Sequence, residues 1–233
     1  MPDALKRGVA LTIVLMATHS PLLVGQSLSY LALGDSYTIG ESVSPDRRWP
    51  VQLADTLRSL GYPVARPEIV AVTGWTTDEL LTGIEEESLN EPYELVSLLI
   101  GVNNQYRGYD IDRYRTEFTE LLNRSIRFAG GRSDHVLVLS IPDYGVTPFA
   151  EDRGLDPSRI ASELDRYNRI NRKISREMGV LYVDIAPLSR QAGEDDALLA
   201  DDGLHPSGTM YGTWVKQILP VLIPELDTWE IKR

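Results

Sequence analysis

The segment LALGDSYTIGE, residues 31–41, decides how this chain is expected to fold. Its apolar first half is typical of a buried strand, and the strand-like run stops at Gly34, two residues before Ser36. A serine at such a junction lies at the carboxyl edge of a sheet, near the start of a helix, where backbone N–H groups can surround it. Because turns also favour Gly, Asp and Ser, the rest of the chain must decide what this segment does.

Composition limits the classes of protein to which the chain can belong. It has 233 residues, of which 42% are hydrophobic, enough for one domain with a substantial core. The net charge of −11 argues against a nucleic-acid partner, because phosphate binding needs a basic face. The chain has no cysteine, which excludes disulfides, thiolate metal sites and a cysteine nucleophile.

Residues 1–26 are predicted to be a secretory signal peptide, followed by one domain over residues 27–233. Lys6 and Arg7 form a short basic region, and residues 9–17 form an apolar core interrupted only by Thr12. That core is too short to span a bilayer. No clean Ala-x-Ala site is present, and we expect cleavage between about residues 17 and 26 rather than an uncleaved N-terminal helix. The expected location is the periplasm or the cell exterior, without a stable membrane span.

Five apolar segments predict strands, and helical patterns lie between them. The strands are expected at about residues 29–33, 68–72, 95–101, 136–141 and 180–183; they are rich in Val, Ile and Leu and hardly alternate, as strands covered on both faces do. Helices are expected from Trp49 to Gly61, from the capping box at Thr76 to about Glu87, over the stripes 114–126 and 160–178, and from about Thr209 to Leu219, before Pro220. This alternation predicts a three-layer α/β/α fold around one parallel sheet.

The carboxyl ends of parallel strands meet at one edge of the sheet, so four distant segments are expected to converge. They are residues 34–36, 73–75, 101–104 and 201–206. A long segment after the fourth strand, residues 142–158, is expected to emerge at the same edge as a loop that shapes access to the site.

Acyl transfer requires a nucleophile, a base and a group that orients the base. Ser36 supplies a hydroxyl, and His205 is the expected base by near elimination among three histidines. His19 lies in the expected signal peptide, while His135 opens the fourth strand at the opposite end of the sheet and is expected to be structural and partly exposed.

The orienting acid is expected to be Asp202, three residues before His205 across a glycine that permits a tight turn. Asp201 is the competing candidate and is ranked lower for its spacing. Three donors could hold a developing oxyanion: the N–H of Ser36, the N–H of Gly74 and the side-chain amide of Asn103. Taken singly, Gly74 and Asn103 are ordinary turn and loop residues, and only their joint placement favours this role.

These segments resemble the four blocks of the SGNH (GDSL-type) serine hydrolase family, in the family's order. Residues 34–37 (GDSY) match the block with the nucleophile, Gly74 the glycine block, residues 101–104 (GVNN) the Gly-x-Asn-Asp block, and residues 202–205 (DGLH) the Asp-x-x-His block. The resemblance implies a flavodoxin-like fold, no metal or organic cofactor, and ester cleavage by Ser36, Asp202 and His205. Two departures stand out: Asn104 replaces the commoner Asp, and Tyr37 the commoner Leu.

The expected activity is hydrolysis of carboxylic esters with short acyl groups, with acetyl esters of carbohydrate among them. Lysophospholipase, thioesterase and acyltransferase activities at the same residues are the alternatives, and a non-catalytic binding module is a third class that the intact Ser-His-Asp set argues against. Aromatic residues expected at the site edge are interpreted as substrate-binding or as loop packing. They are Tyr37, Trp75, Tyr106 and Tyr144, together with Tyr109 and Phe149.

Overall fold

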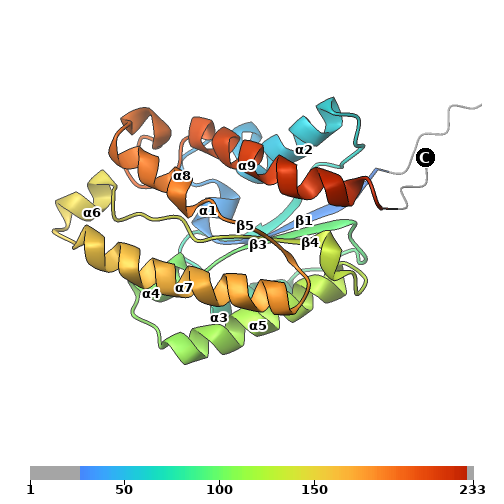
Figure 1. Ribbon diagram of the computed structural model, residues 1–233, viewed down its shortest axis with the longest axis horizontal. Helices are drawn as coiled ribbons and strands as arrows, with labels where there is room; N and C mark the ends of the chain where they lie inside the picture. The colour runs from blue at the N-terminus through green and yellow to red at the C-terminus, as the bar shows by residue number, and fades with distance from the viewer. Residues whose placement is uncertain (1–26, 230–233) are drawn as a thin grey trace, which may run out of the picture.

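The computed structural model describes residues 27–229, so the expected signal peptide lies outside the described residues. Within that range five strands form one parallel sheet in the order β2-β1-β3-β4-β5, between two layers of helices (Figure 1). The strands are β1 (Tyr30–Gly34), β2 (Glu68–Ala71), β3 (Leu95–Leu99), β4 (Val136–Leu139) and β5 (Leu181–Val183). This confirms the predicted three-layer α/β/α, flavodoxin-like architecture with its five-stranded sheet.

The three central strands are buried along their whole length, as their unbroken apolar sequences predict. β1 lies between β2 and β3, with Gly34 paired with Ala71 on one side and with Leu99 on the other. The chain therefore reverses its direction of winding at β1, which places the switch point of the fold at the carboxyl ends of β1 and β3. Ligands of open α/β sheets bind at such points.

Two helical layers cover the sheet (Figure 1). α2 packs against α9 on one face, while α3, α5 and α7 pack side by side on the other. The helices of the described chain are α1 (Ser36–Ile39), α2 (Trp49–Ser59), α3 (Thr77–Glu86), α4 (Val102–Tyr106), α5 (Ile111–Phe128), α6 (Pro148–Asp152), α7 (Pro157–Glu177), α8 (Ala186–Ser189) and α9 (Gly208–Leu226). The predicted capping box opens α3, where the side chains of Thr76 and Glu79 cap each other's backbone N–H groups.

Three details of the sequence-based prediction were wrong. α9 continues through Pro220 and Pro224, because Ile218 and Leu222 are buried on its inner face and packing outweighs the lost hydrogen bonds. Leu60 was expected on the inner face of α2, but the helix ends at Ser59 and Leu60 is 52% exposed. The segment 142–158 is not a loop throughout, since it contains α6.

No helix within residues 27–229 has both the length and the apolar character required to cross a membrane.

Candidate active site

Ser36 is the first residue of α1 and is separated from the end of β1 by Asp35 alone. It is buried. Only a glycine fits at position 34, because a Cβ there would lie 2.2 Å from Thr38 Oγ1 and 2.4 Å from the Leu99 carbonyl oxygen. Asp35 caps α1, with its Oδ1 accepting a hydrogen bond from the Tyr37 N–H at 3.0 Å. The GDSY sequence thus forms a strand-to-helix turn that holds Ser36 at the switch point.

Four of the residues that the sequence analysis identified line one cavity of about 140 Å³. Ser36, Gly74, Asn103 and His205 all line it, although they come from four separate segments of the chain. The convergence expected at the carboxyl edge of the sheet therefore occurs in one small hollow.

His205 is oriented by Asp202 through a hydrogen bond of 2.7 Å between Nδ1 and Oδ2. The other carboxylate oxygen, Oδ1, accepts hydrogen bonds of 2.9 Å from the backbone N–H groups of Leu204 and His205. Gly203, at φ +66°, provides the left-handed residue that this turn requires. A carboxylate at Nδ1 selects the tautomer with its hydrogen on Nδ1, which leaves Nε2 as a proton acceptor.

The hydroxyl of Ser42 also supports Asp202, and sequence reasoning missed this residue. Ser42 donates a hydrogen bond of 2.6 Å to Asp202 Oδ2, across 160 positions of sequence. Partial burial acts to raise the pKa of Asp202, but hydrogen bonds from Ser42, His205 and two backbone amides lower it to about 2. Ser42 is also the one non-glycine residue of the described chain with a positive φ, at 62°. No local signal in the sequence marks it.

The segment after β2 places Gly74 in the lining of the cavity, and Arg107 at the end of α4 holds the conformation of that segment. Gly74 has φ +90°, a value that favours glycine, and its carbonyl oxygen accepts a hydrogen bond of 2.6 Å from Arg107 Nη2. Arg107 also forms an ion pair with Glu79 at 3.1 Å. Arg107 is a second residue that sequence reasoning missed.

Asn103 is fixed by the same segment. Its Nδ2 donates a hydrogen bond of 2.9 Å to the Trp75 carbonyl oxygen, and because an amide NH₂ carries two hydrogens, one remains for the cavity. Asn104, the departure from the family pattern, is fully buried and forms hydrogen bonds with the Thr77 N–H at 3.1 Å and the Thr77 hydroxyl at 2.7 Å. Asparagine thus ties α4 to the start of α3 without a charge.

Asp35 lies directly before Ser36 but differs chemically from Asp202. It is 1% exposed, and Oδ2 accepts no hydrogen bond within the described chain. Burial raises the pKa of Asp35 to about 7, despite opposing hydrogen bonds from backbone N–H groups that include Tyr37 and Gly101. Its role in this turn is that of the helix cap of α1.

The aromatic residues divide between the cavity and its surroundings. Tyr37, Tyr106, Tyr144 and Phe149 line the cavity, and the Tyr37 ring lies edge-on to the His205 ring at 5.6 Å. The indole of Trp75 does not line it but packs on Gly83 of α3, where a Cβ would approach that ring to 2.1 Å. Tyr109 lines a larger neighbouring cavity.

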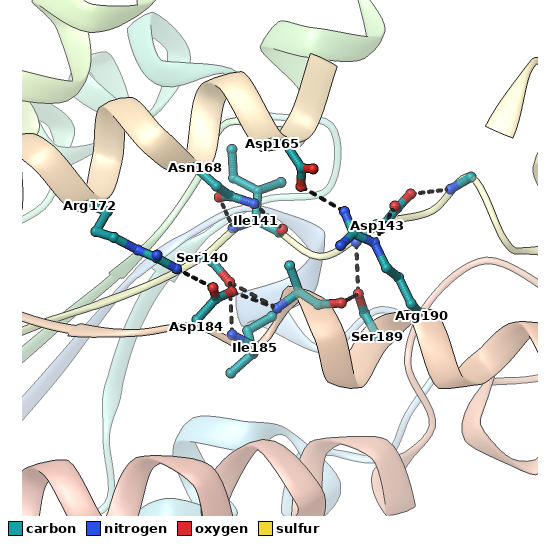
Figure 2. Close-up of polar contacts among 12 residues, drawn as sticks. Ser140, Ile141, Asp143, Asp165, Asn168, Arg172, Asp184, Ile185, Ser189 and Arg190 are labelled. Carbon is teal, nitrogen blue, oxygen red and sulfur yellow. Dashed lines mark hydrogen bonds and ion pairs between the residues drawn. The ribbon is translucent and has the colours of Figure 1, made fainter. Parts of the chain in front are cut away.

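A polar network anchors the segment after β4 that carries Tyr144 into the cavity (Figure 2). Asp143 is buried and accepts a hydrogen bond of 2.9 Å from Arg190 Nε, while its own N–H donates to the Ser189 hydroxyl at 2.8 Å. Two residues earlier in this segment, the Asn168 side chain of α7 accepts a hydrogen bond from the N–H of Ile141 and donates one to its C=O. The backbone on both sides of Pro142 is therefore held by side chains from α7 and α8.

The competing residues lie elsewhere. Asp201 is exposed, and no hydrogen bond within the described chain joins it to His205. His135 has the structural place expected of it, but it is buried rather than partly exposed: its ring stacks on Trp229 at 3.7 Å and bonds the Glu94 carbonyl oxygen. Within residues 27–229, no cluster of three His, Cys, Asp or Glu side chains is arranged to hold a metal ion.

A family model described as "GDSL-like Lipase/Acylhydrolase family" matches residues 32–212. The chain belongs to this family. Membership makes it a carboxylic ester hydrolase of the GDSL, or SGNH, type, which confirms the resemblance drawn from the four sequence blocks.

Individual proteins that the chain resembles share a quarter or less of its residues. The chain is 25% identical over 206 residues to an acetylxylan esterase of Geobacillus stearothermophilus, a match that covers 79% of this chain and 89% of that protein. Among solved structures, it resembles TesA with a TM-score of 0.66 at 18% identity, covering 84% of this chain and 99% of TesA. It resembles Axe2, an acetylxylan esterase from G. stearothermophilus, with a TM-score of 0.64 at 20% identity, covering 90% and 98% of the two chains. These structural likenesses support the fold.

Proposed function

We propose that this hydrolase cleaves carboxylic esters with short acyl groups, acetyl esters of carbohydrate in particular, with Ser36, His205 and Asp202 as its catalytic triad. One observation carries the proposal. Ser36, Gly74, Asn103 and His205 line a single cavity, and His205 is hydrogen-bonded to Asp202 at 2.7 Å. A nucleophile, a base, an orienting acid and oxyanion donors are thus present together.

The proposed reaction has four proton transfers at His205, two in the formation of the acyl-enzyme and two in its hydrolysis. Nε2 accepts the proton of the Ser36 hydroxyl while Oγ bonds to the ester carbonyl carbon and the carbonyl oxygen becomes an oxyanion. The protonated imidazole then donates to the alcohol oxygen, whose bond to carbon breaks, and an acyl-Ser36 remains. Water enters, gives a proton to His205 and displaces Ser36, which recovers its proton. Asp202, with its pKa near 2, stays ionised and stabilises the imidazolium.

Three donors are proposed to hold the oxyanion: the N–H groups of Ser36 and Gly74 and the free hydrogen of Asn103 Nδ2. The Arg107 bond to the Gly74 carbonyl and the Asn103 bond to the Trp75 carbonyl fix two of these donors before substrate arrives. Donors oriented in advance need no reorganisation as charge develops.

The size of the cavity favours a short acyl group. Its volume of about 140 Å³ is well below the roughly 300–1,000 Å³ of pockets that enclose a drug-sized ligand. The acetylxylan esterase among its relatives is consistent with acetyl as the acyl group. Lysophospholipase, thioesterase and acyltransferase activities remain the alternatives; aryl esters from acetate to octanoate and product analysis with an added alcohol acceptor distinguish them.

Ser36→Ala tests the proposal. Hydrolysis of 4-nitrophenyl acetate is expected to fall about 10⁶-fold, and the variant should no longer be labelled by a fluorophosphonate. Ser59→Ala, which removes an exposed hydroxyl bonded only to the Thr56 carbonyl, is the matched control and should retain both properties. Full hydrolysis by a correctly folded Ser36→Ala variant would exclude Ser36 as nucleophile.

We also propose that residues 1–26 direct export and are removed. N-terminal sequencing of the protein from the periplasm or medium should begin between about residues 18 and 27. A cell-associated protein that begins at Met1 would refute this.

A further inference from the structure

A larger cavity of about 740 Å³ adjoins the proposed catalytic cavity. Tyr106 and Tyr144 line both, so they form a shared wall. Tyr106 is 50% exposed and Tyr144 is buried, and their rings meet edge to face at 6.0 Å. A substrate whose ester group lies at Ser36 can therefore continue across Tyr106 into the larger cavity.

The lining of the larger cavity is charged as well as aromatic. Glu163 of α7 accepts hydrogen bonds of 2.8 Å from Arg159 Nε and from Gln105 Nε2. These two bonds, from Arg159 first, lower the pKa of Glu163, so its carboxylate is ionised and fixed in place. Gln105 lies two residues after Asn103, which links this carboxylate directly to α4.

These charges argue against an acyl chain as the occupant. A hydrocarbon chain that covered Arg159 and Glu163 would remove their water and supply no hydrogen bond in return, which is unfavourable. A hydroxyl-rich molecule exchanges water for direct hydrogen bonds with the same groups. Its C–H faces can pack on the exposed ring of Tyr106.

The occupant is also expected to be neutral. α5 and α7 both begin at this cavity, but their N-termini are already capped by Asp110 and Asp156, each of which accepts hydrogen bonds from two backbone N–H groups. The positive helix ends are thus occupied by the chain's own carboxylates. Two arginines, Arg159 and Arg166, face three carboxylates in the lining, so no excess of positive charge attracts an anion.

We propose that the cavity lined by Tyr106, Arg159 and Glu163 binds the alcohol part of the substrate, a neutral oligosaccharide, while the small cavity holds only its acyl group. This rests on the proposed function, of which it specifies the alcohol side. Glu163 accepts hydrogen bonds from sugar hydroxyls, Arg159 donates to them, and Tyr106 packs against a sugar ring.

The test compares two substrates and three paired variants. Arg159→Leu/Glu163→Leu removes both members of the ion pair and leaves no uncompensated charge, whereas Arg159→Gln/Glu163→Gln keeps hydrogen-bonding groups at both positions. Lys173→Leu/Glu177→Leu removes a pair with the same i,i+4 spacing further along α7, outside both cavities, and is the matched control. The substrates are acetylated xylo-oligosaccharides and 4-nitrophenyl acetate.

The leucine pair should lower the ratio of kcat/KM on the oligosaccharide to kcat/KM on the aryl ester by about tenfold or more, mainly through KM. The glutamine pair should restore most of that ratio, and the control should leave it unchanged. An unchanged ratio in the leucine pair overturns the proposal, as does a gain on 4-nitrophenyl octanoate, which would identify the cavity as an acyl site.

Calorimetric titration with deacetylated xylo-oligosaccharides separates this proposal from the proposed function. Binding by wild type that the leucine pair weakens supports the saccharide site even if no ester is hydrolysed. Hydrolysis of 4-nitrophenyl acetate without saccharide binding overturns the saccharide site and leaves the proposed function intact.

Discussion

The two adjoining cavities are built in different ways. The small cavity takes its polar groups from short segments beside the ends of strands and helices, and two of its proposed donors, at Ser36 and Gly74, are backbone N–H groups. The larger cavity takes its polar groups from side chains on α7 and α4, such as Glu163 and Gln105. Backbone donors are set by the fold, while helix-surface side chains can change without disturbing it. On the two proposals, this contrast separates the residues that carry out the reaction, which are placed by the fold, from the residues that select the substrate.

Asn103→Ala tests this separation with the largest effect. Loss of one oxyanion donor should lower kcat by about 10²–10³ on 4-nitrophenyl acetate and on acetylated oligosaccharide alike, because both substrates develop the same charge. Steady-state kinetics on both substrates, with the melting temperature as a folding control, measure it. Loss on one substrate only would break the separation.

Arg107→Ala addresses the side chain that holds the Gly74 carbonyl. We expect kcat to fall about tenfold with little change in KM, because the removed bond is charge-assisted and positions a donor for the transition state. Arg113→Ala is the matched control, since Arg113 also pairs with α3, through Asp78 at 2.8 Å, but does not contact Gly74. An equal fall in kcat in the two variants would show that Arg107 acts only by stabilising α3.

Ser42→Ala should have a smaller effect, about three- to tenfold on kcat, the value of one ordinary hydrogen bond. Alanine keeps the Cβ, so the backbone at φ 62° is equally unfavourable in both proteins. The pKa of Asp202 should rise from about 2 toward its ordinary value. A carboxyl group whose pKa is lower in the folded protein than in the unfolded chain stabilises the fold at pH values above its unfolded pKa, which is near 4. The difference in unfolding free energy between wild type and variant should therefore be full at neutral pH and disappear as the pH falls toward 2. A gap that persists at pH 2 would contradict this origin.

Asp35→Asn should change turnover least and alter the pH dependence of stability instead. The pKa of Asp35 is raised to about 7, so the folded protein holds a proton that the unfolded chain loses near pH 4. Relative to the variant, wild type should lose stability as pH rises from 4 to 7, by about 1.4 kcal/mol per pH unit at most. Asparagine also caps helices, which keeps the turn. Urea unfolding across this range measures the difference, and parallel profiles would refute it.

The sequence predicted the small cavity well because its parts are local. A glycine that no other residue can replace, a serine two positions later, and Asp202 three positions before His205 are all short-range patterns. Gly34 and Ser36 are placed by the strand that precedes them, and strands with unbroken apolar sequences are easily recognised. Asp202 and His205 share one short turn before α9. The family match then confirmed the assignment to GDSL-type hydrolases.

The residues that support the site could not be predicted in the same way. Ser42 contacts Asp202 across 160 positions, and Arg107 reaches Gly74 across 33. Neither contact leaves a periodic or motif-like trace. For Trp75 the sequence left substrate binding and loop packing open, and in the structure its indole packs on Gly83. Pro220 was predicted to end the last helix from its local effect on the backbone, but α9 continues through it because residues on both sides of the proline are buried.

The position of β1 as the first strand of the chain has a consequence for synthesis of the protein. The proposed nucleophile lies at the end of this first strand, whereas the proposed base lies on the turn that precedes α9, the last helix. A ribosome therefore completes Ser36, Gly74 and Asn103 long before His205 exists. On the proposed mechanism, a nascent chain that ends before His205 has its nucleophile but no base to activate it. The order of the elements along the chain therefore places the proposed base among the last residues to be made, directly before α9.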